Sequence, residues 1–340
     1  MKRTGQLWDK ICTFDNALDA YFKARRSKRY RHEVLQFEKD REYNLQKIVN
    51  QLSTLKYVPG RYNSFKIYEP KERLIMALPF KDRVVQHMIC NYIEPIYEKR
   101  FYEHSYACRK EKGVHAASET LQRWVYNLEV VEGKKIYALK CDIHHYFQSV
   151  NHERLKQENR RYIKDKKLLT VLDLIIDHNG SFPDGVGIPV GNLTSQLFAN
   201  VYLNVLDQYI KTELHCKYYI RYMDDFIILS EDINELRGLL KIIEEFLRTE
   251  LKLTLNPKTA IVAAKNGIDF VGYKHYSQTK KVRKTAMRRM RRLLHKYEKG
   301  SISKEEFIVS FESRTAYMEH ADTYSLVRRY VKEAERLLAA

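Results

Sequence analysis

The chain contains 340 residues, a length that predicts more than one folding unit. Its 61 lysines and arginines exceed its 43 aspartates and glutamates, and the net charge of +18 favours a polyanionic partner, the alternative being a merely soluble basic surface. No apolar run approaches membrane-spanning length, which excludes a helical membrane protein. The five cysteines are scattered without metal-ligand spacing, and with no signal peptide they predict a reducing, cytoplasmic location.

The first part of the chain is predicted to be helical, because apolar residues recur at helical spacing up to about Leu55. This part also carries a cluster of cations between Arg25 and Arg31. Residues 61–78 predict strands and turns, with Pro70 as punctuation. Residues 81–100 then predict a further helix.

The middle of the chain follows the order strand, helix, hairpin, helix, strand. A mainly apolar run from Ile136 ends at a single carboxylate, Asp142, and aromatic residues follow it. Helices are predicted over residues 195–214 and 233–247, with the hairpin between them and a last strand over residues 259–263. This order is the split βαβ pattern, whose sheet would place Asp142 beside the hairpin tip, facing Asp224.

The hairpin tip displays two adjacent carboxylates. Apolar runs on both sides of Tyr222-Met223-Asp224-Asp225 predict two short strands around a tight turn. An isolated Asp-Asp pair is more often ordinary turn chemistry. Together with Asp142, however, the pair favours a metal site, because carboxylates bind Mg²⁺ while leaving room for substrate phosphates. Two-metal sites of this kind catalyse phosphoryl transfer.

The last part of the chain, from about residue 277, is predicted to be helical and basic. Between Lys280 and Lys296, cations lie on both sides of apolar residues at helical spacing. The pattern favours a helix that packs on one side and contacts a phosphate backbone on the other. The alternative is a solvated basic face. The candidate nucleic-acid-binding residues are Arg288, Arg289, Arg291 and Arg292.

These motifs resemble those of the reverse transcriptase family over nearly the whole chain. Asp142 and the Tyr222–Asp225 turn match the family's two metal-binding motifs. The resemblance implies an α+β, right-hand polymerase fold with a split βαβ palm and a basic helical thumb. It implies a helical N-terminal extension at residues 1–60, fingers at 61–132, a palm at 133–276 with a fingers insertion at about 150–186, and a thumb at 277–340.

The resemblance further implies an RNA-directed DNA polymerase that uses two Mg²⁺ ions, for which Mn²⁺ can substitute. Its catalytic residues would be Asp142, Asp224 and Asp225, and the metal site would comprise these three residues with Ile143. The implied partners are a template RNA, a primer or cDNA strand and deoxynucleoside triphosphates, with no membrane.

Other motifs match the family's nucleotide pocket and primer grip. Arg73 matches the fingers arginine that contacts the triphosphate, and a guanidinium fork suits phosphate oxygens. Phe147, five positions after Asp142, matches the aromatic steric gate that selects deoxynucleotides. From the residues alone, the alternatives are a surface arginine and an aromatic of the core. The implied nucleotide-binding residues are Arg73, Phe147, Val190, Gly191, Gln196 and Lys258, and the implied primer grip is Phe270, Val271, Gly272 and Tyr273.

One departure from the family pattern indicates a subgroup. Most members have Gln-Gly, three variable residues and Ser-Pro, whereas this chain has Val190-Gly191 and Ser195-Gln196. This version resembles the reverse transcriptases of diversity-generating retroelements, as do residues 81–87 and 105–109. The subgroup implies a phage or bacterial system in which a template-repeat RNA is copied with errors at adenines. It also implies a small basic helical partner, the accessory variability protein.

Two other interpretations stay open from the sequence. The first is a group II intron or retron-like reverse transcriptase, against which the residues at positions 190 and 196 argue. The second is a catalytically silent nucleic-acid-binding protein on a polymerase scaffold, which the presence of all three acids disfavours.

Overall fold

The computed structural model describes residues 3–68 and 72–339. The chain divides into two compact units, each assembled from segments that are distant in sequence. We call them the helical unit (Met1–Glu103, Ile143–His215 and Ile242–Pro257) and the sheet unit (His104–Asp142, Cys216–Lys241 and Lys258–Ala340). Within the described ranges, no helix is both long and apolar enough to cross a membrane.

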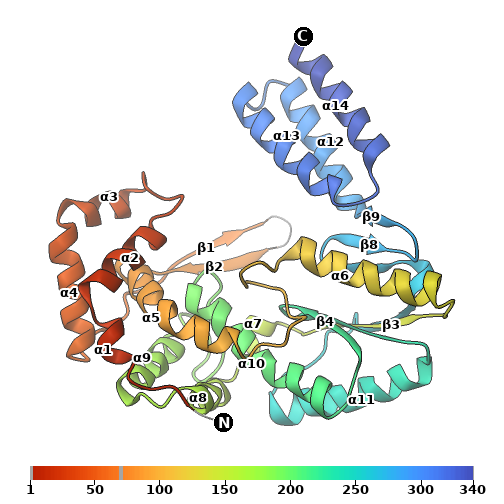
Figure 1. The fold of residues 1–340 in the computed structure, drawn as a ribbon. Coiled ribbons are helices and arrows are strands. Elements are labelled where there is room, and N and C mark those ends of the chain that lie inside the picture. The colour runs from red at the N-terminus through yellow and green to blue at the C-terminus, as the bar shows by residue number, and fades with distance from the viewer. Residues whose placement is uncertain (1–2, 69–71, 340) are drawn as a thin grey trace. The chain divides into compact units, whose positions relative to one another are not determined.

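The helical unit consists of helices and one two-stranded hairpin, which extends away from helices α1–α5 (Figure 1). Helix α5 lies at its centre and contacts α2, α3 and α10, while α10 also packs on α8. The helices are α1 (Trp8–Ile11), α2 (Phe14–Ala24), α3 (His32–Lys39), α4 (Arg41–Ser53), α5 (Phe80–Glu98), α7 (Tyr146–Ser149), α8 (His152–Tyr162), α9 (Lys166–Asp177) and α10 (Leu193–Thr212). The hairpin pairs β1 (Asn63–Ile67) with β2 (Arg73–Ala77).

Local sequence signals explain where several of these helices begin. The side chains of Thr13, Asn151 and Asp165 accept hydrogen bonds from backbone N–H groups in the first turns of α2, α8 and α9. The Asp165 carboxylate also accepts from the backbone of Leu7 and Trp8, which ties the N-terminal segment to α9. Most residues of α10 are buried, and they include the polar residues Asn200, Asn204 and Asp207 as well as apolar ones.

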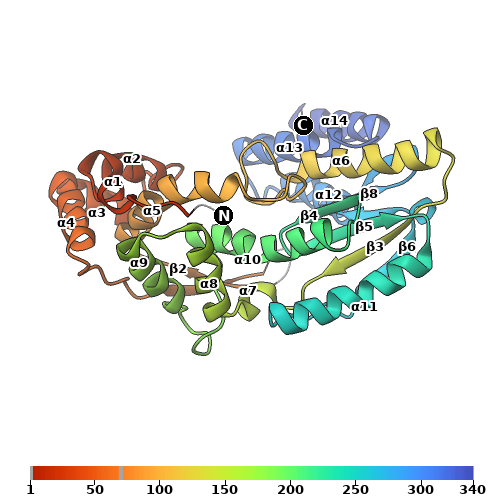
Figure 2. The same cartoon turned by 60° about the horizontal axis from the view of Figure 1, so that its bottom comes forward.

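The sheet unit is built on four antiparallel strands in the order β4-β5-β3-β6. They are β3 (Tyr137–Asp142), β4 (Tyr218–Tyr222), β5 (Asp225–Ser230) and β6 (Ala260–Ala263). Helix α6 (Val114–Tyr126) runs along this sheet and contacts β4, and the π-helical turn Asn127–Val131 extends it (Figure 2). One buried apolar cluster joins α6 to β3, β4 and β5, and its members from α6 include Ala117, Leu121 and Val125.

The split βαβ order is confirmed, because β3, α10, β4, β5, α11 (Ile233–Glu250) and β6 follow one another along the chain. The division into two units passes through α11, whose first part belongs to the sheet unit and whose last part belongs to the helical unit. Helix α6, which lies within the range 61–132 that the resemblance assigns to the fingers, packs against β4 of this sheet.

A second sheet and three helices complete the sheet unit. Strands β7 (Ile268–Phe270), β8 (Tyr273–His275) and β9 (Lys280–Val282) are antiparallel, and a short 3₁₀ turn spans Ala264–Asn266. The predicted helix from Lys280 is wrong in its first residues, because β9 pairs with β8 there and the helix begins at Lys284. Helices α12 (Lys284–Glu298), α13 (Lys304–Glu319) and α14 (Tyr324–Ala339) lie side by side around a shared apolar core (Figure 1).

Candidate active site

Three aspartates lie at one end of the four-stranded sheet. Asp142 is the last residue of β3, and Asp225 is the first residue of β5. The antiparallel register places these two residues directly opposite each other. Asp224 lies in the two-residue turn with Met223 that joins β4 to β5. The residue facing Asp142 is therefore Asp225, with Asp224 one position before it, because the strand resumes immediately after the turn.

The surroundings of Asp225 disfavour the charged form of its carboxyl group. The pKa of Asp225 is raised, chiefly because burial disfavours the carboxylate, and the negative charge of Asp142 adds to this. The cations Lys140 and Arg283 act in the opposite direction, and Asp269 again raises the pKa. A cation placed between Asp142 and Asp225 would relieve this repulsion.

A buried arginine holds the turn between the strands. Arg221, in β4, is 0% exposed, and its guanidinium donates a hydrogen bond from Nη1 to the carbonyl oxygen of Met223 at 3.0 Å. Met223 has a positive φ of 55°, an uncommon conformation for a residue with a side chain. The backbone of Arg221 also pairs with His104 and Tyr106, at 2.9 Å each. Arg221 was not predicted as a site residue, because the only sign of it in the sequence is a charge within an apolar strand.

The donor set at this end of the sheet fits a hard divalent cation. Asp142, Asp224 and Asp225 offer carboxylate oxygens, which Mg²⁺ prefers, and Ile143 can offer only its main-chain carbonyl. Across the residues with described positions, no group of three or more His, Cys, Asp or Glu side chains is close enough to hold a metal alone. Mg²⁺ sites in proteins usually take one or two carboxylates and are completed by substrate phosphates and water.

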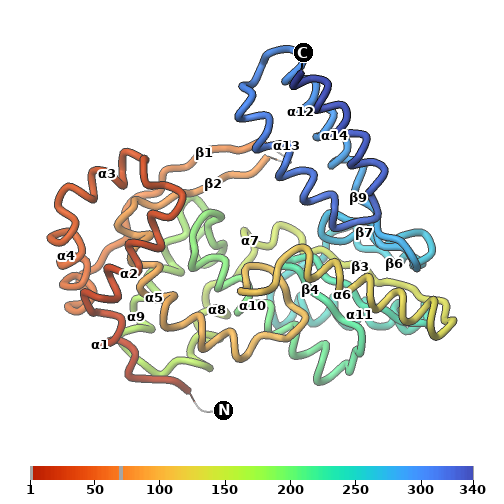
Figure 3. The backbone as a smooth tube through the Cα atoms, turned by 45° about the horizontal axis from the view of Figure 1, so that its top comes forward, coloured from red at the N-terminus to blue at the C-terminus, as the bar shows by residue number. Residues whose placement is uncertain are grey.

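Several predicted nucleotide-binding residues come together in the helical unit. The backbone N–H of Met76 in β2 donates to the carbonyl of Val190 at 3.1 Å, so the Val190 loop is joined to β2. Strand β2, whose first residue is Arg73, runs beside β1 in Figure 3. Gly191 has a φ of 120°, and a Cβ there would lie 3.2 Å from the Met76 carbonyl oxygen. Glycine is therefore required for this close approach.

Phe147 is joined to the same loop, since its carbonyl accepts from the backbone of Ile188 at 2.8 Å. Its neighbour Tyr146 is buried and donates through its hydroxyl to the carbonyl of Ala199 at 2.6 Å. Phe147 itself is half-buried. Tyr146 is thus the core aromatic of α7, and Phe147 keeps part of its ring accessible.

The start of α10 contributes a second polar anchor beside this loop. The side-chain oxygen of Gln86 accepts from the backbone of Leu193 at 3.1 Å, while its buried Nε2 has no hydrogen-bond partner among the described residues. Gln196, in the first turn of α10, is exposed. Gln86 lies in the segment of residues 81–87 that carried part of the subgroup resemblance, although no role was predicted for it.

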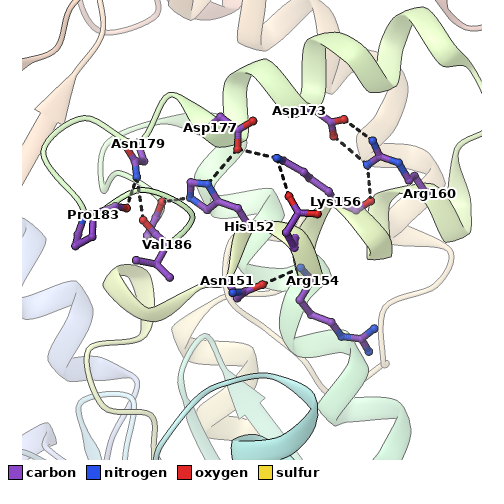
Figure 4. A network of polar contacts seen from close by, with 12 residues as sticks. Asn151, His152, Arg154, Lys156, Arg160, Asp173, Asp177, Asn179, Pro183 and Val186 are labelled. Carbon is purple, nitrogen blue, oxygen red and sulfur yellow. Dashed lines mark hydrogen bonds and ion pairs between the residues drawn. The ribbon is translucent and has the colours of Figure 1, made fainter.

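A network of polar contacts connects the segment that precedes the Val190 loop to its neighbours (Figure 4). His152 is buried and contacts the Asp177 carboxylate through Nδ1 at 3.2 Å and the Gly187 carbonyl through Nε2 at 2.8 Å. Asn179 donates to the carbonyls of Pro183 at 2.8 Å and Val186 at 3.0 Å. These bonds link both ends of residues 179–187 to each other and to His152, and the Val190 segment follows directly.

The predicted primer grip is a tight hairpin in the sheet unit. Val271 and Gly272 form the turn between β7 and β8, with φ values of 41° and 93°. A Cβ on Gly272 would lie 2.1 Å from the hydroxyl of Tyr317 in α13, so only glycine fits. Tyr273 stacks on Tyr317, with ring centroids 4.9 Å apart, and donates to its carbonyl at 2.9 Å. Phe270 is fully buried below the turn.

Lys258 and the α12 arginines are the remaining predicted contacts. Lys258 is exposed in the loop before β6. Along α12, Met290, Leu293 and Leu294 are buried, as the periodicity predicted. The four candidate phosphate contacts, Arg288, Arg289, Arg291 and Arg292, are all exposed. The acids, Lys258 and the primer grip thus belong to the sheet unit, and the other predicted nucleotide-binding residues belong to the helical unit.

Comparisons with known proteins give the chain's relatives. A family model described as "Reverse transcriptase (RNA-dependent DNA polymerase)" matches residues 66–275. Protein YkfC of Escherichia coli (strain K12) is 27% identical over 256 residues, which cover 62% of this chain and 65% of YkfC. The group II intron-encoded protein LtrA of Lactococcus lactis subsp. cremoris is 25% identical over 177 residues, or 50% of this chain and 28% of LtrA.

A solved structure is also similar. The telomerase of Candida albicans, in complex with a fragment of telomeric RNA, matches with a TM-score of 0.51 at 13% sequence identity. The match covers 83% of this chain and 55% of that chain. This likeness confirms the predicted fold class, a right-hand polymerase fold of mixed helices and strands.

The matched regions cover different shares of this chain and of its relatives. The chain spans less than two thirds of the length of each relative named above. The family model, by contrast, spans well over half of the chain and includes β3, the Asp-Asp hairpin and the Val190 loop. The chain therefore belongs to the reverse transcriptase family.

Proposed function

We propose that the protein is an RNA-directed DNA polymerase. The observation that carries this proposal is the register of β3 and β5, which sets Asp142 opposite Asp225 next to the Asp224 turn in a chain of this family. Family membership supports an RNA template and a DNA product, and the net charge of +18 suits a nucleic-acid substrate.

Asp142, Asp224 and Asp225 would hold two Mg²⁺ ions, with Mn²⁺ as a substitute. When bound, such ions activate the attacking 3′-oxygen of the primer and stabilise the charge on the leaving pyrophosphate. The chain's own residues position the reactants. Arg73 binds the triphosphate oxygens through its guanidinium fork, and Lys258 adds a second positive charge near them.

Sugar selection and primer placement are proposed for two further groups. The accessible part of the Phe147 ring excludes a ribose 2′-hydroxyl and so favours deoxynucleotides. The Val271-Gly272 turn holds the primer end, supported from below by Tyr317. The exposed arginines of α12 bind the backbone of the primer–template duplex.

For the subtype, we propose an error-prone reverse transcriptase of a diversity-generating retroelement in a phage or bacterium. Val190 and Gln196 carry this proposal, since a branched apolar side chain replaces the usual amide donor and acceptor next to the nucleotide. Template-repeat RNA would be copied with errors at adenines, in the bacterial cytoplasm, with a small basic accessory protein as partner. All five cysteines are free thiols, as a reducing compartment requires.

The likeness to LtrA favours a second candidate, an intron-type enzyme. Sequencing of the cDNA distinguishes the two. The retroelement subtype predicts substitutions concentrated at template adenines, whereas an intron-type enzyme predicts no preference for adenine.

Primer extension tests the polymerase proposal directly. The chain should extend an oligo-dT primer on a poly-rA template with Mg²⁺, and EDTA should stop the reaction. Asp224→Asn should abolish extension while RNA binding stays close to wild type, because the lost ligand acts in the transition state. Asp15→Asn, an exposed acid in the first turn of α2, is the matched control. Full activity of Asp224→Asn, or RNA binding without any extension by the wild type, would refute the proposal.

A further inference from the structure

The turn between α2 and α3 is strongly basic. We call residues 25–31 the basic turn; five of its seven residues are lysine or arginine, and no acid lies between Asp19 and Glu33. The turn has a defined backbone, in which Lys28 donates to the carbonyl of Arg25 at 2.9 Å and Arg31 donates to that of Lys28 at 3.0 Å. It is therefore an ordered surface between two helices.

Most of this charge has no counter-ion among the residues that the structure describes. Arg25 is paired with Glu38 at 2.5 Å. The other four cations are exposed and make no ion pair with any residue of described position: Arg26, Lys28, Arg29 and Arg31. The pKa of Lys28 is lowered by partial burial and by the charges of Arg83 and Arg31. An anion on this surface would relieve that repulsion.

An aromatic side chain projects from the middle of these cations. Tyr30 is 93% exposed, the highest value among the exposed large apolar and aromatic side chains of the described residues. It lines a surface hollow of about 540 Å³ together with Arg26, Ser27, Lys28, Arg29 and Arg31. An aromatic face among unpaired cations suits nucleic acid, whose bases stack while its phosphates bind the charges.

We propose that the basic turn binds single-stranded RNA, with a base stacked on Tyr30 and phosphates on Arg26, Lys28, Arg29 and Arg31. An unpaired strand is required, because the base faces of a duplex are covered by their neighbours. The turn lies outside residues 66–275, the part that matches the family model. None of its residues is among the proposed catalytic or nucleotide-binding residues, and given the proposed polymerase function the turn would retain an RNA strand during synthesis.

Binding measurements on the full chain test this site without catalysis. The probe is a fluorescein-labelled rU15 oligonucleotide, titrated without Mg²⁺ and nucleotides at several salt concentrations. Arg29→Gln with Arg31→Gln should weaken binding and lower the salt slope by about 1.4, since each phosphate contact on a single strand contributes about 0.7. The exposed pair Lys166→Gln with Lys167→Gln on α9 is the charge-matched control.

Tyr30 provides a readout that charge alone would not affect. Tyr30→Ser should weaken binding about fivefold or more, as expected for loss of one stacked base. Tyr30→Trp should retain affinity, and its indole fluorescence should be quenched by rU15 beyond any change in the wild type. Thermal melts of each variant confirm that the chain stays folded.

Each outcome decides between proposals. The proposed RNA site is wrong if the Arg29/Arg31 and Lys166/Lys167 double variants lose equal affinity for rU15. It is also wrong if Tyr30→Ser keeps the wild-type affinity. Loss of binding to phosphatidylserine vesicles without loss of RNA binding would instead identify a membrane-surface site, which also overturns it. If the wild type never extends a primer but the basic-turn variants still lose RNA binding, the proposed RNA site stands. Only the polymerase proposal is then rejected.

Discussion

The guanidinium of Arg221 donates to the carbonyl of Met223 from a fully buried position, so the conformation of the aspartate turn depends on a charged side chain beneath it. Lysine cannot reproduce the planar donor fork of arginine. Arg221→Lys should therefore lower primer-extension activity and raise the Mg²⁺ concentration needed for half-maximal rate, by about 10- to 100-fold as for other groups that orient metal ligands. Mg²⁺ titration of the extension rate measures both quantities. The exposed Arg248→Lys is the control, and an unchanged Mg²⁺ requirement would show that Arg221 does not position the acids.

Removing the charge of Asp225 should stabilise the metal-free protein. Because the pKa of Asp225 is raised in the folded state, its proton stabilises the fold below the ordinary Asp pKa, and this contribution is lost as pH rises through the raised value. At pH 7, Asp225→Asn removes the repulsion and should raise Tm in EDTA, by about 2–4 °C per kcal/mol.

Calorimetry in EDTA and in Mg²⁺ checks this prediction. Mg²⁺ should raise the Tm of the wild type, because the ion binds only the folded state, and should have little effect on Asp225→Asn. The same variant should lack polymerase activity. A lower Tm for the variant in EDTA at pH 7 would contradict the electrostatic interpretation.

Phe147→Ala should allow incorporation of ribonucleotides. The substitution removes the accessible ring from α7, while Tyr146 keeps its buried hydrogen bond to Ala199. Single-nucleotide incorporation of the ribo- and deoxy- forms gives the ratio of their kcat/KM values, which should shift toward the ribo- form. Phe147→Leu retains more bulk and should keep more of the discrimination. If the ratio is the same in Phe147→Ala and the wild type, another residue selects the sugar.

Val190→Gln should lower misincorporation opposite template adenine more than opposite other bases. An amide restores hydrogen bonding near the base pair, and discrimination built on polar contacts exceeds discrimination built on shape. The ratio of kcat/KM for wrong and right nucleotides, measured opposite each template base, separates fidelity from a general slowing of synthesis. Val190→Ile keeps an apolar side chain and should remain error-prone. An unchanged ratio opposite adenine in Val190→Gln would locate the cause of error elsewhere.

Paired alanine substitutions at Arg288 and Arg292 should weaken primer–template binding and flatten its salt dependence. Both side chains are exposed on α12, opposite the buried Met290 and Leu294. Each lost phosphate contact removes about 0.9 from the slope on a duplex, so the pair should remove about 1.8. Fluorescence anisotropy over a range of salt concentrations measures the slope. The same slope in variant and wild type would identify this side of α12 as a solvated face.

The elements around the acids could be predicted because their signals are local. Strong apolar periodicity located α10 and α11 within a few residues, and the run before Asp142 located β3. Strand β9 was missed because its pairing with β8 is a contact between segments, whereas the cations of residues 280–282 match the helix that follows. Arg221 was missed for a similar reason, since its burial depends on His104 and Tyr106, more than a hundred residues earlier in the chain.

The bond from Met76 to Val190 has a consequence for which substitutions this chain can accept independently. Strand β2 begins with Arg73, and three residues later, about 10 Å along the strand, it donates to the Val190 carbonyl. A substitution that shifts β2 to alter the grip on triphosphate therefore moves the residue proposed to govern base discrimination. Variants selected only for faster synthesis should consequently also show altered mutation spectra, because the backbone of β2 positions both Arg73 and Val190.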